Sequence, residues 1–169
     1  MAYFDYEKEI EDQISARLAQ SNTVFEVNRY YPTASPEMMI DFVLSKVKSK
    51  PSVFVRCTGM QSDSMSVQGE LLNTTYTVEI VMATNDAGKM KQIKSESRSV
   101  NILAQAVMGR LIGWKVNLTE QPSQFVVLNS VRDLFTLDQV DARIATFSVD
   151  GVVIDMDNLG LDNVLENLL

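Results

Sequence analysis

In one segment of the chain every second side chain is apolar and most of those between are polar, and this alternation constrains the fold more than any other feature. The residues on its apolar side are Tyr76, Val78, Ile80 and Met82. Because the side chains of a β-strand point alternately to the two faces of a sheet, this spacing predicts a strand within 67–84 that has one apolar face. Other parts of the chain must cover that face, and the elements that do so decide the fold class.

Apolar residues recur at helical spacing in other segments, and we predict helices over 5–19, 36–47 and 90–112. The first helix begins after the capping residue Asp5, and Ile10, Ile14 and Leu18 recur along it every four residues. In the last helix, Gly109 is small enough to allow close packing against a sheet. The chain therefore contains amphipathic helices suited to covering the apolar face.

Further β-strands are predicted over 23–29, 52–60, 124–133 and 139–153. Strands that follow one another directly favour antiparallel pairing, and separate helices are expected to cover one face of the sheet. The sequence thus predicts a single α+β domain over 1–153, with a mostly antiparallel central sheet and flanking helices. Residues 154–169 are predicted to form an acidic C-terminal tail or arm that contains several leucines.

The side chains that most often carry enzyme chemistry are scarce in this chain. It has no histidine and a single cysteine, Cys57, so histidine-based nucleophile pairs and a zinc site are excluded. Cys57 falls in a predicted strand, where we expect a buried structural thiol. No two carboxylates have a spacing that marks an acid–base pair. We therefore expect a protein that is not an enzyme and has no catalytic residues and no cofactor, with a carboxylate-based enzyme as a remote alternative.

The charge of the chain also argues against some partners. The net charge is −7, which repels the phosphate backbone of nucleic acids and anionic lipid surfaces. The longest cationic stretch, 89–98, contains Glu96 and is expected to be a solvated segment. No run approaches the roughly 20 apolar residues that a membrane-spanning helix needs. We expect neither specific nucleic-acid binding nor a membrane partner.

One motif leaves a different class of function open. The segment 155–166 resembles the calcium-binding loop of an EF-hand, with Asp155, Asp157 and Glu166 at ligand positions and Gly160 at the turn. Leu159, however, stands where a ligand belongs, and a strand rather than a helix is predicted before the loop. An acidic tail is the favoured interpretation, and a calcium-responsive binding module is the alternative.

The order of the predicted elements resembles that of a known family. The chain opens with the helix around Ile10–Leu18, and the strands Val53–Cys57 and Tyr76–Met82 follow. A long helix containing Ala104–Leu111 and two late strands then close the fold. Over about 3–153, this arrangement resembles the tail terminator proteins of tailed bacteriophages, especially the Mu-like prophage group with contractile tails.

The resemblance implies a structural protein of the virion tail, assembled in the cytoplasm of the bacterial host. It implies a homo-oligomer, a hexameric ring that caps the tail tube, stops its polymerisation and connects to the head or neck. Its partners would be the tube, sheath and neck proteins, and DNA would pass through the ring without being bound specifically. Another neck or tail-completion protein is the alternative within the same class.

A ring places a physical demand on each copy, because two different complementary surfaces must meet head to tail. From the pattern of exposure alone, we expect these surfaces at the edge of the strand 52–60, in a polar loop over 59–66 and in the C-terminal tail.

Overall fold

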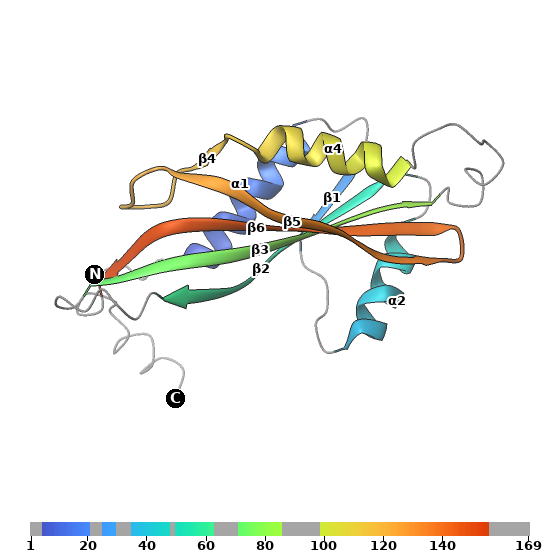
Figure 1. Cartoon of the computed structure of the whole chain (residues 1–169), viewed down its shortest axis with the longest axis horizontal. Helices are drawn as coiled ribbons and strands as arrows, with labels where there is room; N and C mark the ends of the chain where they lie inside the picture. Colours follow the sequence, from blue (N-terminus) through green and yellow to red (C-terminus); the bar gives the residue numbers. More distant parts are fainter. Residues whose placement is uncertain are drawn as a thin grey trace.

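The computed structural model describes residues 5–20, 25–29, 35–47, 50–62, 71–85 and 99–155, which form an α+β fold (Figure 1). The helices of the described part are α1 (Tyr6–Ala19), α2 (Pro36–Lys46) and α4 (Ser99–Leu111). Its strands are β1 (Glu26–Arg29), β2 (Ser52–Ser62), β3 (Leu71–Asn85), β4 (Lys115–Val116), β5 (Gln124–Leu137) and β6 (Val140–Asp155). Of the helix predicted over 90–112, residues 90–98 lie outside the described part.

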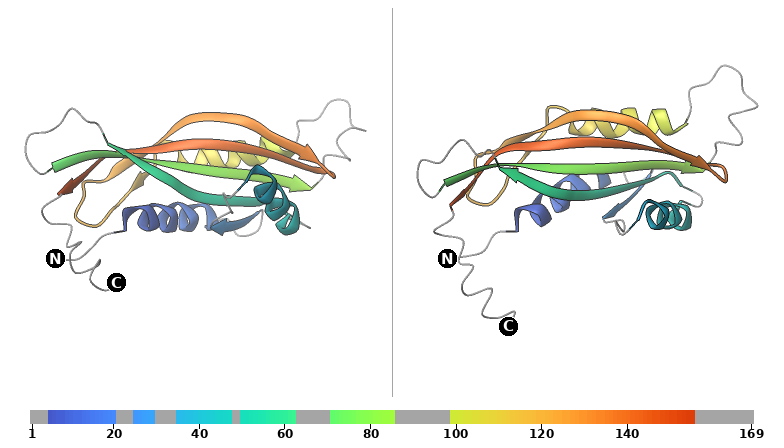
Figure 2. Two further views of the ribbon diagram at one scale, coloured as in Figure 1. Left: turned by 90° about the horizontal axis from the view of Figure 1, so that it is seen from below. Right: turned by 60° about the horizontal axis from the view of Figure 1, so that its bottom comes forward.

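The strands form one sheet in the order β1-β2-β3-β6-β5-β4. β1 runs parallel to β2, and the other neighbouring strands of the described part pair antiparallel. The sheet is therefore mostly antiparallel, as the sequence predicts. β3 and β6 lie at its centre, and Figure 2 shows these long strands twisting across the molecule.

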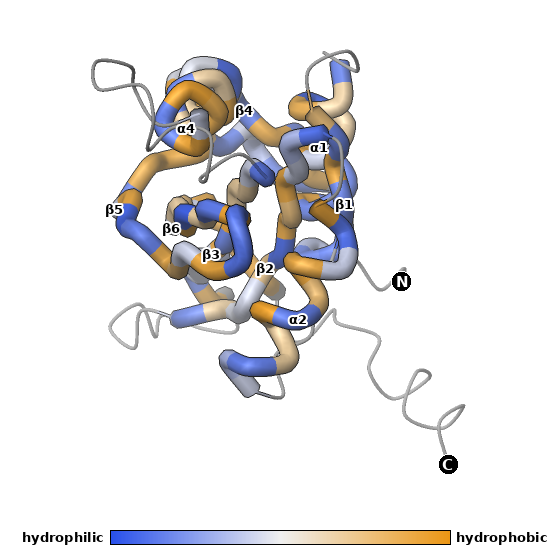
Figure 3. Tube along the Cα trace, turned by 90° about the vertical axis from the view of Figure 1, so that its right-hand side faces the viewer, coloured by the Kyte–Doolittle hydropathy of each residue, from blue (hydrophilic) through white to orange (hydrophobic). Residues whose placement is uncertain are grey.

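The helices lie on both faces of the sheet, so the expectation that they cover one face is wrong. In the end-on view of Figure 3, α1 and α4 lie above β2, β3 and β6, and α2 lies below these strands. The reason is that the central strands are apolar on both faces near α2. Phe54 and Val81 point away from α1 and α4, and both are fully buried in a second core with Val43 of α2. A sheet that is apolar on both faces needs cover on both.

The larger core lies between the sheet and the pair of helices α1 and α4. The predicted stripe of α1 (Ile10, Ile14 and Leu18) is fully buried there, at 0% exposure. The alternation of β3 is confirmed as well, because Val78 and Ile80 are fully buried in the same core.

The helix starts also follow the sequence. The side chain of Asp5 accepts a hydrogen bond from Lys8 N at 3.1 Å, and that of Ser35 accepts one from Met38 N at 3.2 Å. Pro36 occupies the first turn of α2, where its missing N–H costs nothing. These local caps fix where both helices begin.

The hairpin of β5 and β6 is longer than the sequence predicts. Its turn residues Asp138 and Gln139 both have positive φ, 49° and 72°, which suits the tight two-residue turns that join antiparallel strands. At the other end, β6 continues to Asp155, and Ile154 is buried in the larger core. The fold therefore extends slightly beyond the predicted domain end at 153, and residues 156–169 lie outside the described part.

Gly109 does not have the role predicted for it. It lies on the exposed side of α4, and a Cβ atom added there would meet nothing within 4 Å. Close contact with the sheet is made instead by Ala104, which is 1% exposed. Gly113, with φ of 78°, ends the helix.

Candidate functional site

Several carboxylates lie along α1, and they are the main candidates for reactive groups among the described residues. Glu9 and Glu11 reach across to other segments and accept hydrogen bonds from backbone N–H groups. Glu9 Oε2 accepts from Thr119 N at 2.9 Å, and Glu11 Oε1 accepts from Cys57 N at 2.7 Å. Both carboxylates therefore join α1 to distant parts of the chain.

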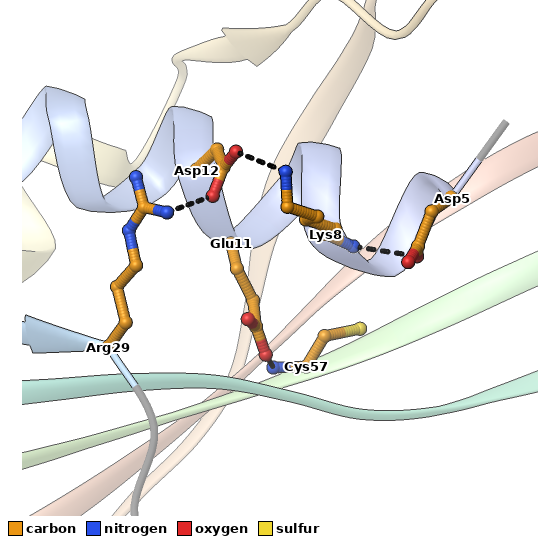
Figure 4. Close-up of polar contacts among 6 residues, drawn as sticks. All are labelled: Asp5, Lys8, Glu11, Asp12, Arg29 and Cys57. Carbon is orange, nitrogen blue, oxygen red and sulfur yellow. Dashed lines mark hydrogen bonds and ion pairs between the residues drawn. The ribbon is translucent and has the colours of Figure 1, made fainter.

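Two further acids of α1 bind nearby partners (Figure 4). Asp5 caps the helix, and Asp12 forms ion pairs with Lys8, at 3.6 Å, and with Arg29 of β1. The side chains of Lys8 and Arg29 are more than half exposed, so each pair adds only about 0.2–1 kcal/mol. These two acids thus cap the helix and form ion pairs, and each contributes a small amount of stability to the fold.

Glu7 is the α1 acid with a perturbed titration. Partial burial, and then the charges of Asp5 and Glu11, raise the pKa of its carboxyl group above the usual 4.5. Both of these neighbours already accept backbone hydrogen bonds. These hydrogen bonds hold the carboxylates of Asp5 and Glu11 in place near Glu7.

The bond from Glu11 to Cys57 gives a first prediction. Replacing Glu11 with alanine would leave a part-buried backbone N–H without its acceptor, and the expected loss of stability is about 1–3 kcal/mol. Glu11→Gln keeps an acceptor oxygen and should recover most of that loss. Urea unfolding measures both. As a control, Glu7→Ala removes a carboxylate one turn earlier, and an equal loss there would contradict this role for Glu11.

Cys57 is the buried structural thiol that the sequence predicts. Its side chain lies in the larger core at 6% exposure. Burial is the main cause that raises the pKa of the thiol from 9.0 to about 12. Since the thiolate is the reactive form, this environment makes Cys57 a poor nucleophile.

The thiol should therefore react only after unfolding. Since its pKa rises from 9.0 to about 12, the thiolate at pH 8 is roughly a thousandfold rarer in the folded chain. We expect iodoacetamide labelling at pH 8 to be slowed at least that much relative to the chain in urea. The same pKa shift links the stability of the fold to pH, because the folded chain holds the thiol proton more tightly than the unfolded chain does. The contribution of Cys57 to stability is therefore fully present below pH 9 and is lost as the pH rises towards 12. Rapid labelling of the folded protein would contradict this placement.

The exposed edge predicted at 52–60 is only partly confirmed. β1 pairs with Ser52–Val55, and Glu11 binds the N–H of Cys57, so the first half of this edge is covered. The reason is that the chain returns beside β2 directly after α1, which the sequence did not reveal. Beyond Cys57, no described strand covers the outer edge of β2.

The polar loop predicted at 59–66 begins as a strand. Gly59–Ser62 extends β2 and pairs with Thr74–Thr77 of β3, while residues 63–66 lie outside the described part. Met60, in this extension, is 50% exposed. Within the described ranges, the end of β2, Thr58–Ser62, is therefore a strand end without a neighbour on its outer edge, and it carries a large apolar side chain.

The opposite side of the sheet has a longer open edge. β4 pairs with β5 at Gln124 and Phe125, and Val126 N donates to Trp114 O at 3.0 Å. Beyond Val126, no described strand pairs with the outer edge of β5. Exposed apolar side chains lie along this strand: Phe125 at 51%, Val127 at 43% and Leu137 at 45%. Backbone groups on an open edge are ready to pair with another strand.

The residues of the calcium alternative are not brought together in the described part. Asp155 ends β6, opposite Leu71 of β3, whereas Asp157 and Glu166 lie outside the described residues. Within the described ranges, no group of three acidic or cysteine residues is placed to hold a metal ion. The calcium site stays a prediction, which calorimetry with millimolar calcium would test.

A cluster of cations and rings between α1 and α4 was not predicted. The Arg17 guanidinium lies 5.8 Å from the Trp114 ring centre, and that of Arg110 lies 5.0 Å from the Phe25 ring centre. Arg110 also donates to Leu18 O at 2.9 Å. The cluster holds the two helices side by side, and Trp114 packs against the larger core.

The outer face of α4 was also missed, although the sequence holds a signal for it. Ile102 and Ile112 fall outside the buried stripe of that helix, and they are 59% and 57% exposed. Large aliphatic residues away from the buried stripe are the sign of a second apolar contact.

Comparison of the chain with models of known protein families finds no match, and comparison with curated proteins finds none either. Among the described residues, no helix is both long and apolar enough to cross a membrane.

Proposed function

We propose that this protein is a structural subunit that acts by associating with copies of itself, as a ring-forming tail terminator of a bacteriophage. In this role the ring caps the tail tube, stops its polymerisation and connects to the head or neck. The observation that carries the proposal is a pair of unlike open edges on opposite sides of one sheet, the end of β2 and the outer edge of β5.

These edges suit a head-to-tail contact. A ring forms when one surface of each copy meets a different surface of the next and the rotation closes. The end of β2 is short and the edge of β5 is long, so the two are different surfaces. Pairing of strand edges between copies would satisfy backbone groups and cover the apolar side chains of β5.

The arrangement of the acids is consistent with this proposal. On α1, the carboxylates of Asp5, Glu9, Glu11 and Asp12 are occupied in capping, cross-linking or ion pairs. A protein that acts through its surfaces needs no reacting group.

Light scattering and negative-stain electron microscopy of the purified chain test the proposal. We expect closed rings, and we expect them to bind the ends of purified tail tubes. Val127→Lys places a charge on the open edge of β5 and should abolish the rings. Val153→Lys is the matched control, because Val153 is similarly exposed, at 39%, but does not lie on an open strand edge. It pairs with β3 on one side, and on the other side its backbone N–H and C=O bind the side chain of Gln121.

The outcomes separate the alternatives. A chain that stays monomeric at all concentrations, even with tubes present, would overturn the proposal. Rings that form but ignore tube ends would point instead to another neck or tail-completion protein. Equal behaviour of the two lysine variants would show that the edge of β5 is not the contact.

A further inference from the structure

The outer face of α4 carries no charged side chain, although the chain as a whole has a net charge of −7. The exposed residues that define this face are Ile102, Gln105, Gly109 and Ile112. Ile112 continues the helix, since its N–H donates to Met108 O at 2.9 Å. The single charged residue of α4, Arg110, points its guanidinium at Leu18 O and the Phe25 ring. The face is therefore neutral and carries two large exposed apolar side chains.

Gly109 at the middle of this face is not explained by the protein's own packing. Glycine within a helix is less stable than alanine because it loses more backbone freedom on folding. A Cβ at this position would meet nothing within 4 Å, so the fold of one copy does not require glycine here. A close contact with a second molecule would require it.

The spacing along the face is complementary to itself. Ile102 and Ile112 lie equally far from Val107 along the helix, and so do Gln105 and Gly109. When two copies of α4 lie antiparallel, related by a two-fold axis that crosses the outer face at the level of the buried Val107, Ile102 faces Ile112 of the second copy. Gln105 then lies against Gly109 of that copy, where the absence of a side chain leaves room for it. A two-fold contact requires this kind of match, in which one patch fits itself.

We propose that the outer face of α4 binds the same face of a second copy of this chain, with the two helices antiparallel. Charge favours this partner, because two strongly acidic copies repel each other least where neither carries a charge. The area of the outer face of α4 limits the affinity of the dimer. A helix of this length spans about 20 Å, so the contact is smaller than the roughly 1,600 Å² of a standard stable interface. The dimer is therefore weak, with association at micromolar concentrations or above.

This contact is separate from the proposed ring. It uses one helix face and a two-fold axis, whereas the ring uses two unlike sheet edges. Both contacts together would join two rings through their α4 helices. The experiments below use the Val127→Lys background, in which the edge of β5 is blocked, so that the two proposals succeed or fail independently.

Cysteine cross-linking tests the pairing directly. Ile102→Cys and Ile112→Cys chains, distinguished by mass, are mixed under mild oxidation. We expect the mixed disulfide between positions 102 and 112 to form at least tenfold faster than either homodimer. Cys57 does not compete, since it is buried in the core. Equal rates for all pairs, or no cross-linking at millimolar protein, would overturn the antiparallel contact.

Gly109→Ala gives a second test with two opposite effects. The variant should raise the melting temperature of dilute monomer by about 2–4 °C, as expected for a change of about 1 kcal/mol in a chain of this size. The added methyl group should also weaken dimerisation about tenfold in sedimentation equilibrium. A variant that is more stable yet dimerises as before would contradict the proposal.

A charge variant completes the series. Gln105→Lys places two like charges in the contact and should abolish dimerisation. Ala16→Lys places the same charge on the exposed side of α1 and is the matched control, which should leave the dimer intact. Loss of the dimer in both variants would show that net charge, rather than the α4 face, governs association.

Discussion

Phe147→Ala is expected to lower the free energy of unfolding by about 3–5 kcal/mol, the usual cost of removing a fully buried phenylalanine. Phe147 lies on the central strand β6 and is 0% exposed. In the register of the sheet it stands between Val78 of β3 and Leu128 of β5. Its ring therefore fills the middle of the larger core, where neighbouring strands restrict any collapse into the cavity. A loss of this size is a large fraction of the roughly 5–15 kcal/mol by which most domains are stable.

Urea unfolding followed by circular dichroism measures this loss. Phe125→Ala is the control, because it removes the same ring from a position that is 51% exposed. The control should cost no more than about 1 kcal/mol, including its contact with Lys115. Similar losses in the two variants would contradict the placement of Phe147 at the centre of the core.

Phe54→Ala is expected to cost a similar amount, about 3–4 kcal/mol, but with a local signature. Phe54 is fully buried on the face opposite α1 and α4, within the second core. Its ring lies 5.7 Å from the ring of Phe42 on α2, in an edge-to-face arrangement. Among the described residues, α2 packs only against this core, so losing the ring removes its main anchor.

Hydrogen exchange distinguishes this local effect from global destabilisation. Amide protons of α2 should lose protection in Phe54→Ala well before those of α1, which is held by the other core. In Phe147→Ala, protection should fall in both helices together. Uniform loss of protection in Phe54→Ala would show that the two cores unfold as one.

Elements governed by local rules could be predicted from the sequence. α1 follows from its cap at Asp5 and its four-residue apolar spacing, and both are confirmed within one residue of the predicted start. β3 follows from the alternating apolar residues between Tyr76 and Met82. In each case the deciding contacts repeat along a short stretch, so the pattern of residues records them.

Features that depend on distant parts of the chain could not be predicted. The side of the sheet chosen by α2 depends on Phe54 and Val81, which are apolar residues on the second face of two strands. The short β4 and the parallel position of β1 have no periodic pattern. The length of the β5–β6 hairpin depends on turn residues, Asp138 and Gln139, that adopt positive φ without being glycine.

The same limit applies to the candidate surfaces. The strand 52–60 was expected to have an open edge, but the bond from Glu11 to Cys57 joins residues far apart in the sequence and covers part of it. The uncovered edge of β5 depends on how far β4 reaches, which only the assembled sheet reveals. On α4, Ile102 and Ile112 can be identified in the sequence, but which face of the helix is buried depends on the strands that it packs against.

The central position of β3 and β6 has a consequence for the time the chain needs to fold. β3 pairs with β6 from Leu71 opposite Asp155 to Asn85 opposite Val140, so a long loop must close before the middle of the sheet exists. Contacts between distant segments are slow to form because the entropy of closure is lost before any contact compensates for it. Refolding should therefore take milliseconds to seconds, as in proteins dominated by non-local strand pairing.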